Sequence, residues 1–136
     1  MELADVLFLP MRDAKTVFGY SEEKAEAVLD LLAKPFPQAT IVLTLGAIGA
    51  AARTSSGSYW FQPAFEAEVV ERLGGGDAFS AGFLYGLLKT NDAKSALRWG
   101  AAVAALKYTI PSDFPLVDLE EVESLVTGRP SQGLIR

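Results

Sequence analysis

The sequence predicts an α/β protein with three layers and a mostly parallel sheet. Short apolar segments alternate with longer helical patterns through the first half of the chain. The residues after position 77 read as a succession of helices. Glycine-rich turns follow apolar segments at residues 44–49 and 73–76. Ligands of such sheets bind beyond the carboxyl ends of the strands, so both turns are expected at the binding end.

The first predicted strand and helix lie at the N-terminal end. Residues 5–9 form a short apolar run that is typical of a buried strand. Residues 11–18 have a helical pattern, which Gly19 is expected to end. Residues 40–45 are β-branched and apolar throughout. We expect this last segment to be a central parallel strand that is covered on both faces.

A second helix is predicted between these strands. Ser21 has the side chain of an N-cap, and two glutamates follow it in what would be the first turn. The helical pattern continues to about Ala33, where Pro35 and Pro37 stop it.

The chain after Gly49 has a hairpin pattern followed by a helical region. Small residues, a Ser-Ser-Gly turn and an aromatic segment predict two antiparallel strands. Residues 66–70 are expected to form a further short strand. Helices are predicted over residues 78–89, 92–109 and 119–126. Arg98 and Lys107 interrupt the middle helix, which therefore resembles a packed helix and not a membrane span. Asp118 and Glu121 have capping-box spacing, and Gly128 ends the last helix.

Composition limits the chemistry that the chain can perform. The 136 residues contain 12 basic and 17 acidic side chains, with a net charge of −5. The basic residues are scattered, so nucleic acid is not an expected partner. There is no cysteine and no histidine, which excludes thiol nucleophiles, Ser-His-Asp triads and ordinary zinc sites. No signal peptide or membrane span is expected, and the absence of disulfides fits a cytoplasmic protein.

The segment Leu-Gly-Gly-Gly-Asp-Ala-Phe-Ser-Ala-Gly-Phe-Leu at residues 73–84 predicts an anion-binding turn. Glycines leave no Cβ between their amides and a ligand, so the amides of Gly74, Gly75 and Gly76 can converge on one negative group. A helix that begins just after them adds its unpaired first-turn amides. Asp77 would lie where a transferred phosphate meets an acceptor hydroxyl, which suits a general base.

Asp77 also has a simpler interpretation. A carboxylate after a tight turn often caps the helix that follows, and the glycine run alone does not decide between cap and base. Two familiar phosphate-binding motifs are excluded. No Gly-Lys-Ser or Gly-Lys-Thr follows the glycines, and Phe79 stands where a Rossmann motif has its third glycine.

The glycine run resembles the second signature of the ribokinase-like carbohydrate kinases of the PfkB family. In that signature Gly-Ala-Gly-Asp supplies an anion hole and a catalytic base, and Gly74, Gly76 and Asp77 match it, with Gly75 in place of alanine. The longer form Arg-Leu-Gly-Gly-Gly-Asp is similar to the 2-keto-3-deoxygluconate kinase branch. The resemblance implies a ribokinase-like α/β sandwich and ATP-dependent phosphorylation of a sugar or sugar-acid hydroxyl.

A second glycine segment supports the resemblance. Thr44-Leu45-Gly46-Ala47-Ile48-Gly49 resembles the Thr-x-Gly-x-x-Gly loop that lines the nucleotide site in these kinases. By itself the segment is more typical of a strand-to-hairpin turn, and the presence of both glycine segments in the family's order reverses that preference. The resemblance implies that Thr44, Gly46, Ala47 and Gly49 contact ATP.

The remaining residues implied by the resemblance come from other parts of the chain. Gly76 and Ala101 are implied as further nucleotide contacts, although an alanine-rich packed helix explains Ala101 as well. The family often has Asn-x-x-Glu after the first strand, where this chain has Pro10-Met11-Arg12-Asp13. Asp13 is the remaining candidate for holding Mg2+ through a bound water. Glu71 replaces an aspartate that many relatives carry six residues before the base.

Chain length limits what the resemblance implies. It covers residues 1–128 as the C-terminal half of a kinase domain, with a loose tail at residues 129–136. Complete members are about twice as long, and most of the sugar contacts belong to the half that is missing here. We therefore expect either a homo-oligomer or association with a missing N-terminal half. Two alternatives stay open at this point, a non-catalytic module that binds nucleotide or self-associates, and a kinase for another acceptor such as fructose or ribose.

Overall fold

The computed structural model describes residues 4–111 and 117–128. It divides the chain into two compact units, residues 1–63 and residues 64–136, which are described separately below. The expected tail at residues 129–136 lies outside the described residues. No helix in the described ranges is both long enough and apolar enough to cross a membrane.

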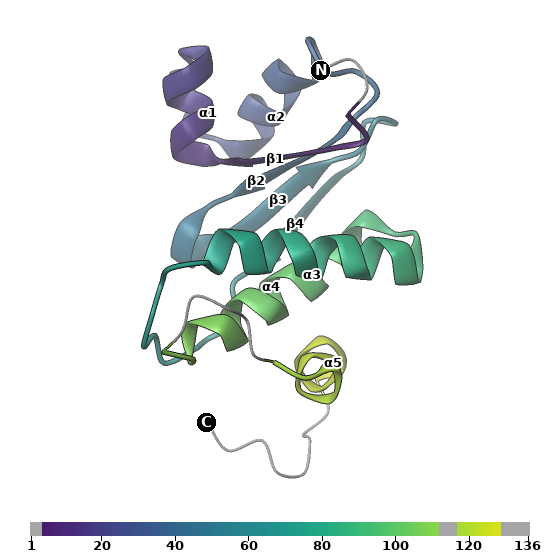
Figure 1. Ribbon diagram of the computed structural model, residues 1–136. Coiled ribbons are helices and arrows are strands. Elements are labelled where there is room, and N and C mark those ends of the chain that lie inside the picture. Colours follow the sequence, from purple (N-terminus) through teal and green to yellow (C-terminus); the bar gives the residue numbers. More distant parts are fainter. Residues whose placement is uncertain (1–3, 112–116, 129–136) are drawn as a thin grey trace. The chain divides into compact units, whose positions relative to one another are not determined.

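The first unit is built around a four-stranded sheet (Figure 1). Its strands are β1 (Val6–Pro10), β2 (Thr40–Thr44), β3 (Gly49–Arg53) and β4 (Tyr59–Pro63), and they lie in that order. The pairing of β1 with β2 is parallel, and the other two pairings are antiparallel. The sheet is therefore mixed, and the predicted parallel arrangement holds only for β1 and β2. Parallel neighbours need a crossover of about a dozen or more residues, which the short connections after β2 and β3 do not provide.

Two helices cover one face of this sheet (Figure 1). α1 (Met11–Phe18) ends at Gly19 in the left-handed conformation, as predicted. α2 (Ala25–Ala33) packs beside it, and the two helices share a buried core with β2 and β3, formed by Ala14, Val28, Leu29, Leu32, Phe36, Ala39, Ile41, Leu43 and Ala51. Burying one large aliphatic side chain stabilises the fold by roughly 1.5–3 kcal/mol relative to exposing it. The core therefore fixes the sheet register and the place where β2 ends.

The prediction for the start of the second helix was wrong. α2 begins at Ala25 after Lys24, and no side chain caps it, so Ser21 is not the N-cap. The residues before it make tertiary contacts instead. The Tyr20 ring stacks on Phe18 with centroids 5.6 Å apart, and Glu23 pairs with Lys15 across 3.0 Å. These contacts with α1 outweigh the local capping preference of serine.

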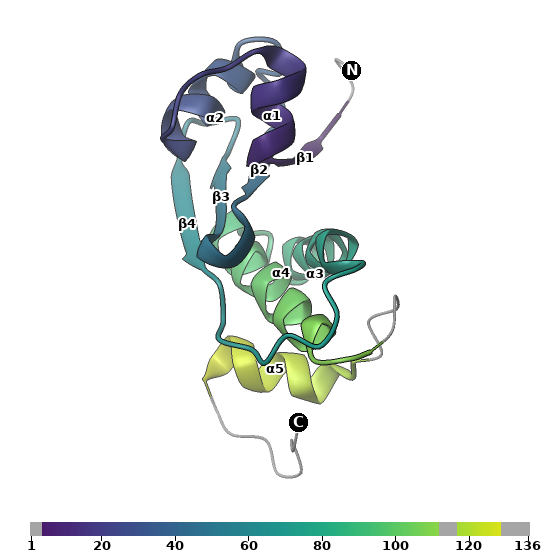
Figure 2. The ribbon, with the colours of Figure 1, turned by 90° about the vertical axis from the view of Figure 1, so that its left-hand side faces the viewer.

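The described residues of the second unit form three helices. α3 (Gly75–Thr90) and α4 (Ala93–Tyr108) lie side by side, and α5 (Leu119–Thr127) packs against α4 (Figure 2). One of its buried clusters is formed by Ala78, Trp99, Ala102, Val103, Leu106 and Val122. Arg98 extends from α4 to the carbonyl oxygens of Leu125 and Val126 at the end of α5. A guanidinium at that end satisfies carbonyls that have no partner within the helix.

Two glycines of α3 allow α4 to approach closely. A Cβ added at Gly82 would lie 2.8 Å from the carbonyl oxygen of Trp99. A Cβ at Gly86 would lie 2.7 Å from the Trp99 Cβ. Real side chains do not approach this closely, so the contact requires glycine at both positions. The Gly82 and Gly86 spacing in the sequence therefore reflects helix packing.

Two other predictions around the glycine run were wrong. Residues 66–70 form no strand, and α3 begins at Gly75 instead of Ala78. The amide of Val70 donates to the carbonyl oxygen of Tyr108, so the backbone here pairs with the end of α4 and not with a neighbouring strand. The helix starts early because Gly74 takes the left-handed conformation and turns the chain directly into it.

Asp92 is predicted to stabilise α4 as its N-cap. Its carboxylate accepts hydrogen bonds from the Ser95 amide at 3.1 Å and the Ser95 hydroxyl at 2.7 Å. Asp92→Ala should lower the free energy of unfolding by about 1 kcal/mol, as measured by urea denaturation. Asp92→Asn keeps an acceptor and is the matched control.

The same pair of variants separates the cap from its charge. The Ser95 hydrogen bonds lower the pKa of Asp92 below its ordinary value. Because the folded pKa is the lower one, the charge contributes stability above the ordinary carboxyl pKa, and this contribution is lost as pH falls through the lowered pKa. The advantage of wild type over Asp92→Asn should therefore shrink in acid. An advantage that grows on acidification would contradict this assignment.

Gly75 and Gly76 are predicted to respond differently to alanine. A Cβ at Gly75 would lie 2.4 Å from Cε1 of Tyr108, whereas a Cβ at Gly76 has nothing within 4 Å. Gly75→Ala should displace the tyrosine ring and lower the free energy of unfolding by about 1–3 kcal/mol. Gly76→Ala should be neutral or stabilising by up to about 1 kcal/mol, because alanine favours a helix. When both glycine variants also carry Tyr108→Ala, most of the difference between their free energies of unfolding in urea should disappear.

Candidate functional site

The glycine turn presents free amides that differ from the predicted set at one glycine. Gly74 is the N-cap of α3 with φ of 83°, and Gly75 and Gly76 form the first two residues of the helix. The Gly75 amide donates to the Arg72 carbonyl oxygen at 3.2 Å. The amides of Gly76 and Asp77 have no acceptor among the residues that the structure describes. The Gly74 amide is likewise without an acceptor in the described ranges, so the amides of Gly74, Gly76 and Asp77 are available to an anion at this helix start.

Asp77 lies in the first turn of α3 with an exposed side chain. Its carboxylate makes no hydrogen bond or ion pair within the described ranges. The residue in the N-cap position is Gly74, and no side chain caps the helix. The capping interpretation of Asp77 therefore lacks the hydrogen bond that would define it, and the carboxylate is free to accept a proton from a ligand.

The backbone before the glycine turn is attached to the end of α4. The carbonyl oxygen of Tyr108 accepts hydrogen bonds from the amides of Val70 at 2.7 Å and Glu71 at 3.1 Å. The Tyr108 ring also lies where a side chain at Gly75 would be. Arg72 places its guanidinium carbon 5.9 Å from the centroid of this ring. Tyr108 thus positions the turn, a role that our sequence analysis missed because it depends on contacts across the chain.

Glu71 adds a local contact to the same turn. Its Oε1 accepts a hydrogen bond from the Leu73 amide at 3.0 Å. This bond is the main reason that the pKa of Glu71 lies below its ordinary value. Partial desolvation opposes the shift, and the Arg72 amide and the charge of Lys107 add to it. Glu71 is therefore held in its ionised form beside the glycines.

The second glycine segment lies in the first unit, at the carboxyl end of β2. Thr44 is the last residue of that strand, and residues 46–48 form one turn of 3-10 helix. The Leu45 amide donates to the Gly49 carbonyl oxygen at 2.8 Å and closes the loop. Gly46 and Gly49 have φ values of 61° and 142°, which side chains with a Cβ rarely adopt. The loop therefore combines the predicted hairpin connection with exposed backbone at Gly46 and Ala47.

Ala101 and Asp13 occupy separate places. Ala101 is buried in α4, within the second unit. Asp13 lies in the first turn of α1, within the first unit, and Arg12 donates to its carboxylate at 3.3 Å. Across residues 4–111 and 117–128, no three or more acidic side chains gather where they could hold a metal ion. The predicted site residues thus form two groups, Thr44, Gly46, Ala47, Gly49 and Asp13 in one unit, and Gly74, Gly75, Gly76, Asp77 and Ala101 in the other.

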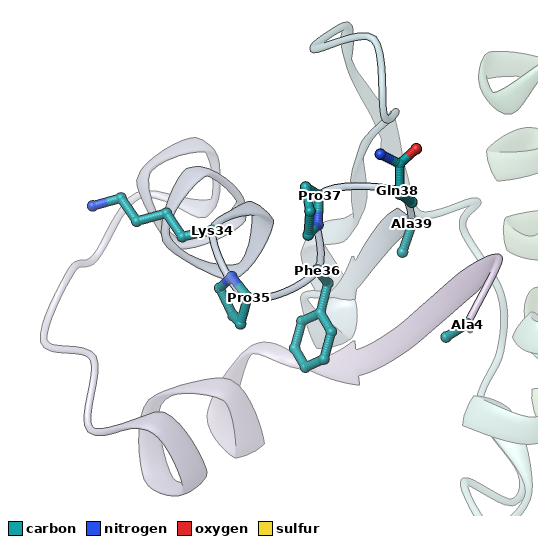
Figure 3. A pocket seen from close by; sticks show the side chains of 7 residues that line it. All are labelled: Ala4, Lys34, Pro35, Phe36, Pro37, Gln38 and Ala39. Carbon is teal, nitrogen blue, oxygen red and sulfur yellow. The ribbon is translucent and has the colours of Figure 1, made fainter. Parts of the chain in front are cut away.

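A cavity of about 360 Å³ lies at the opposite end of β2 from the Thr44 loop (Figure 3). Its walls come from the start of β1 and the connection between α2 and β2, and are formed by Ala4, Lys34, Pro35, Phe36, Pro37, Gln38 and Ala39. Ligands of α/β sheets bind at the carboxyl ends of the strands. This cavity is at the amino end and contains no carboxylate, so we assign it no part in the candidate site.

Comparisons with known proteins agree with the glycine segments. Residues 1–113 match the family model of the pfkB family carbohydrate kinases. The 2-dehydro-3-deoxygalactonokinase of Haloferax volcanii is 39% identical over 124 residues, which are 91% of this chain and 38% of that protein.

Solved structures show the same similarity. The 2-dehydro-3-deoxygluconokinase of Thermotoga maritima matches with a TM-score of 0.76 and 28% identity, over 91% of this chain and 41% of that one. Arabidopsis thaliana ribokinase complexed with ribose and ATP matches with a TM-score of 0.79 and 22% identity, over 93% and 45% of the two chains. The chain thus spans less than half of each of these relatives. Because the family model and these relatives match most of its residues, the chain belongs to the pfkB family of carbohydrate kinases and shares their ribokinase-like α/β fold.

Proposed function

We propose that this chain carries the phosphate-binding and proton-accepting part of an ATP-dependent kinase for a 2-keto-3-deoxy sugar acid. The observation that carries the proposal is the start of α3. There amides without acceptors lie beside an exposed carboxylate that makes no bond within the described residues. Family membership supports phosphoryl transfer as the reaction for such a site.

Asp77 is the proposed general base. Its carboxylate accepts the proton of the sugar hydroxyl as the hydroxyl oxygen attacks the γ-phosphorus of ATP. The amides of Gly76 and Asp77, with the positive end of the α3 dipole, stabilise the negative charge on the transferred phosphoryl group. Gly74 adds an amide that has no acceptor in the described ranges, and Gly75 contributes only indirectly. Gly74 supplies the left-handed turn, and the Gly75 amide is already bonded to Arg72.

Nucleotide binding is proposed for the loop after β2. Thr44, Gly46, Ala47 and Gly49 offer a hydroxyl and exposed backbone without bulky side chains, which suits close approach of a ligand. The relative complexed with ribose and ATP has the same fold, which supports ATP as the donor. Ala101 is buried in α4, so we propose for it a packing role within the second unit and no polar contact with a nucleotide.

Magnesium is proposed only as the ion that accompanies ATP. Kinases of this family use ATP and a divalent metal. The described residues do not form a cage for a divalent ion, and the carboxylate of Asp13 already pairs with Arg12. Mg2+ retains several waters and is commonly held by nucleotide phosphates with only one or two carboxylates. Asp13 is thus a candidate for contact through water, and no step of the proposed reaction depends on it.

The acceptor is proposed from the relatives. The two relatives with deoxy sugar acid kinase names, from Haloferax volcanii and Thermotoga maritima, support a 2-keto-3-deoxy sugar acid. Association with a further segment or with a second copy of the chain stays a prediction.

Asp77→Asn is predicted to abolish catalysis without weakening ATP binding. The amide cannot accept the hydroxyl proton, so kcat of the full-length protein should fall by about 10²–10⁴-fold or more. The nucleotide Kd, measured by isothermal titration calorimetry, should stay within about twofold. Asp92→Asn is the matched control, because it removes a carboxylate of the same unit that only caps α4. Wild-type turnover in Asp77→Asn would contradict the assignment of the base.

The acceptor is tested by a coupled ADP-release assay. The panel consists of 2-keto-3-deoxygluconate, 2-keto-3-deoxygalactonate, fructose and ribose, each with ATP and Mg2+. We expect the highest kcat/KM for one of the two keto-deoxy acids. A higher value for fructose or ribose would replace the proposed acceptor and leave the kinase chemistry in place. Nucleotide binding without phosphorylation of any acceptor would favour a non-catalytic module.

A further inference from the structure

Lys107 is an unusual residue in the last turn of α4. Its side chain is fully buried, and its Nζ has no hydrogen-bond partner in the part of the chain that the structure describes. Lysine is rarely buried without a partner, because removing an ammonium from water costs several kcal/mol unless an anion compensates. The burial of Lys107 is therefore a cost that hydrogen bonds of its ammonium within the described residues do not offset.

Glu71 is an anion on which this charge acts. Its carboxylate already accepts the Leu73 amide, and the positive charge of Lys107 further favours its ionised form. The ammonium and the carboxylate are not within ion-pair distance in the structure, so the attraction acts through space. Water reaches the Glu71 carboxylate and screens this attraction, and the charge of Lys107 is the smallest of the causes that lower the Glu71 pKa.

The backbone places Lys107 and Glu71 at the same junction. Tyr108, the next residue after Lys107, accepts hydrogen bonds from the amides of Val70 and Glu71. The ring of Tyr108 then meets Gly75, the first residue of α3. One helix end thus contacts the segment that leads into the glycine turn both before and after Glu71.

We propose that Lys107 is a positioning residue whose buried ammonium holds Glu71, and through it the glycine turn that presents Asp77. The proposal rests on the kinase function proposed above. The ionised Glu71 is drawn toward the end of α4 while it bonds the Leu73 amide, so the turn has one preferred conformation. Gly76 and Asp77 then keep their amides and carboxylate directed at the reacting phosphoryl group.

Two other roles for Lys107 predict different effects of its substitution on activity and stability. A lysine that is merely tolerated in the interior lowers stability, so its removal leaves activity unchanged or improves the protein. A lysine that binds substrate directly acts without Glu71, so the two residues contribute independently. The positioning role alone predicts that loss of either charge has the same effect and that the two effects do not add.

The test uses the full-length protein with Lys107→Met, Glu71→Gln and the double variant. Methionine keeps the length of the side chain, and glutamine keeps an acceptor for the Leu73 amide. Each single variant should lower kcat by about 10- to 100-fold, because misplacement by about 1 Å is enough to do so. KM for the acceptor should stay within about twofold, and the double variant should lose no more than either single one. The melting temperature of Lys107→Met should be unchanged or higher.

A second measurement does not depend on activity. In protein labelled with 13C at the glutamate carboxyl carbon, the pKa of Glu71 should rise in Lys107→Met as the favourable charge is removed. Lys94→Met is the control, because Lys94 is exposed at the other end of α4, and it should leave both the Glu71 titration and kcat unchanged.

The outcomes separate this proposal from the proposed function. An unchanged Glu71 titration in Lys107→Met overturns the proposal, as does a double variant whose losses multiply. A fall in melting temperature that accounts for the lost activity overturns it as well. If Lys107→Met does not fold, Glu71→Gln with full kcat overturns the proposal, and Glu71→Gln with reduced kcat and unchanged KM supports it. A wild-type protein without kinase activity contradicts only the proposed function, and the titration still decides whether Lys107 acts on Glu71.

Discussion

The close approach of α3 and α4 is the constraint on which the second unit depends. Gly82 and Gly86 remove the side chains that would otherwise meet the backbone and Cβ of Trp99. Helices in such close contact have little freedom to slide, because a shift of either helix would bring other side chains into the space that the glycines leave. The direction of α3, and with it the direction of its amino end, is therefore determined by residues well away from the glycine turn.

The end of α4 completes this arrangement. The Tyr108 carbonyl oxygen takes the amides of Val70 and Glu71, and the Gly75 amide is taken by Arg72. Donors that would otherwise compete for a ligand are thereby satisfied within the protein, while those of Gly76 and Asp77 are left open. A site for a transferred phosphoryl group needs such a division, because donors that are already in place require no reorganisation during the reaction.

Local signals in the sequence predicted much of the fold. The helical pattern from about residue 92 predicted α4, and the small and aromatic segments after Gly49 predicted the hairpin of β3 and β4. Both depend on neighbouring residues, such as the hydrogen bond from Ser95 to Asp92. The errors arose where distant residues compete. Ser21 loses its predicted capping role to contacts with α1, and Val70, at the end of the predicted strand over residues 66–70, bonds to Tyr108.

By itself the sequence determined which chemistry is available at the candidate site. It established the order of the glycines and Asp77, the absence of histidine and cysteine, and the resemblance to sugar kinases, since residue types and their spacing are enough for these. The tertiary structure alone decided which amides stay open, that Gly74 and not Asp77 occupies the N-cap position, and that Lys107 is buried near Glu71. The physical reason is that hydrogen-bond partners and burial are set by residues far apart in the chain, and no local pattern records which of them meet.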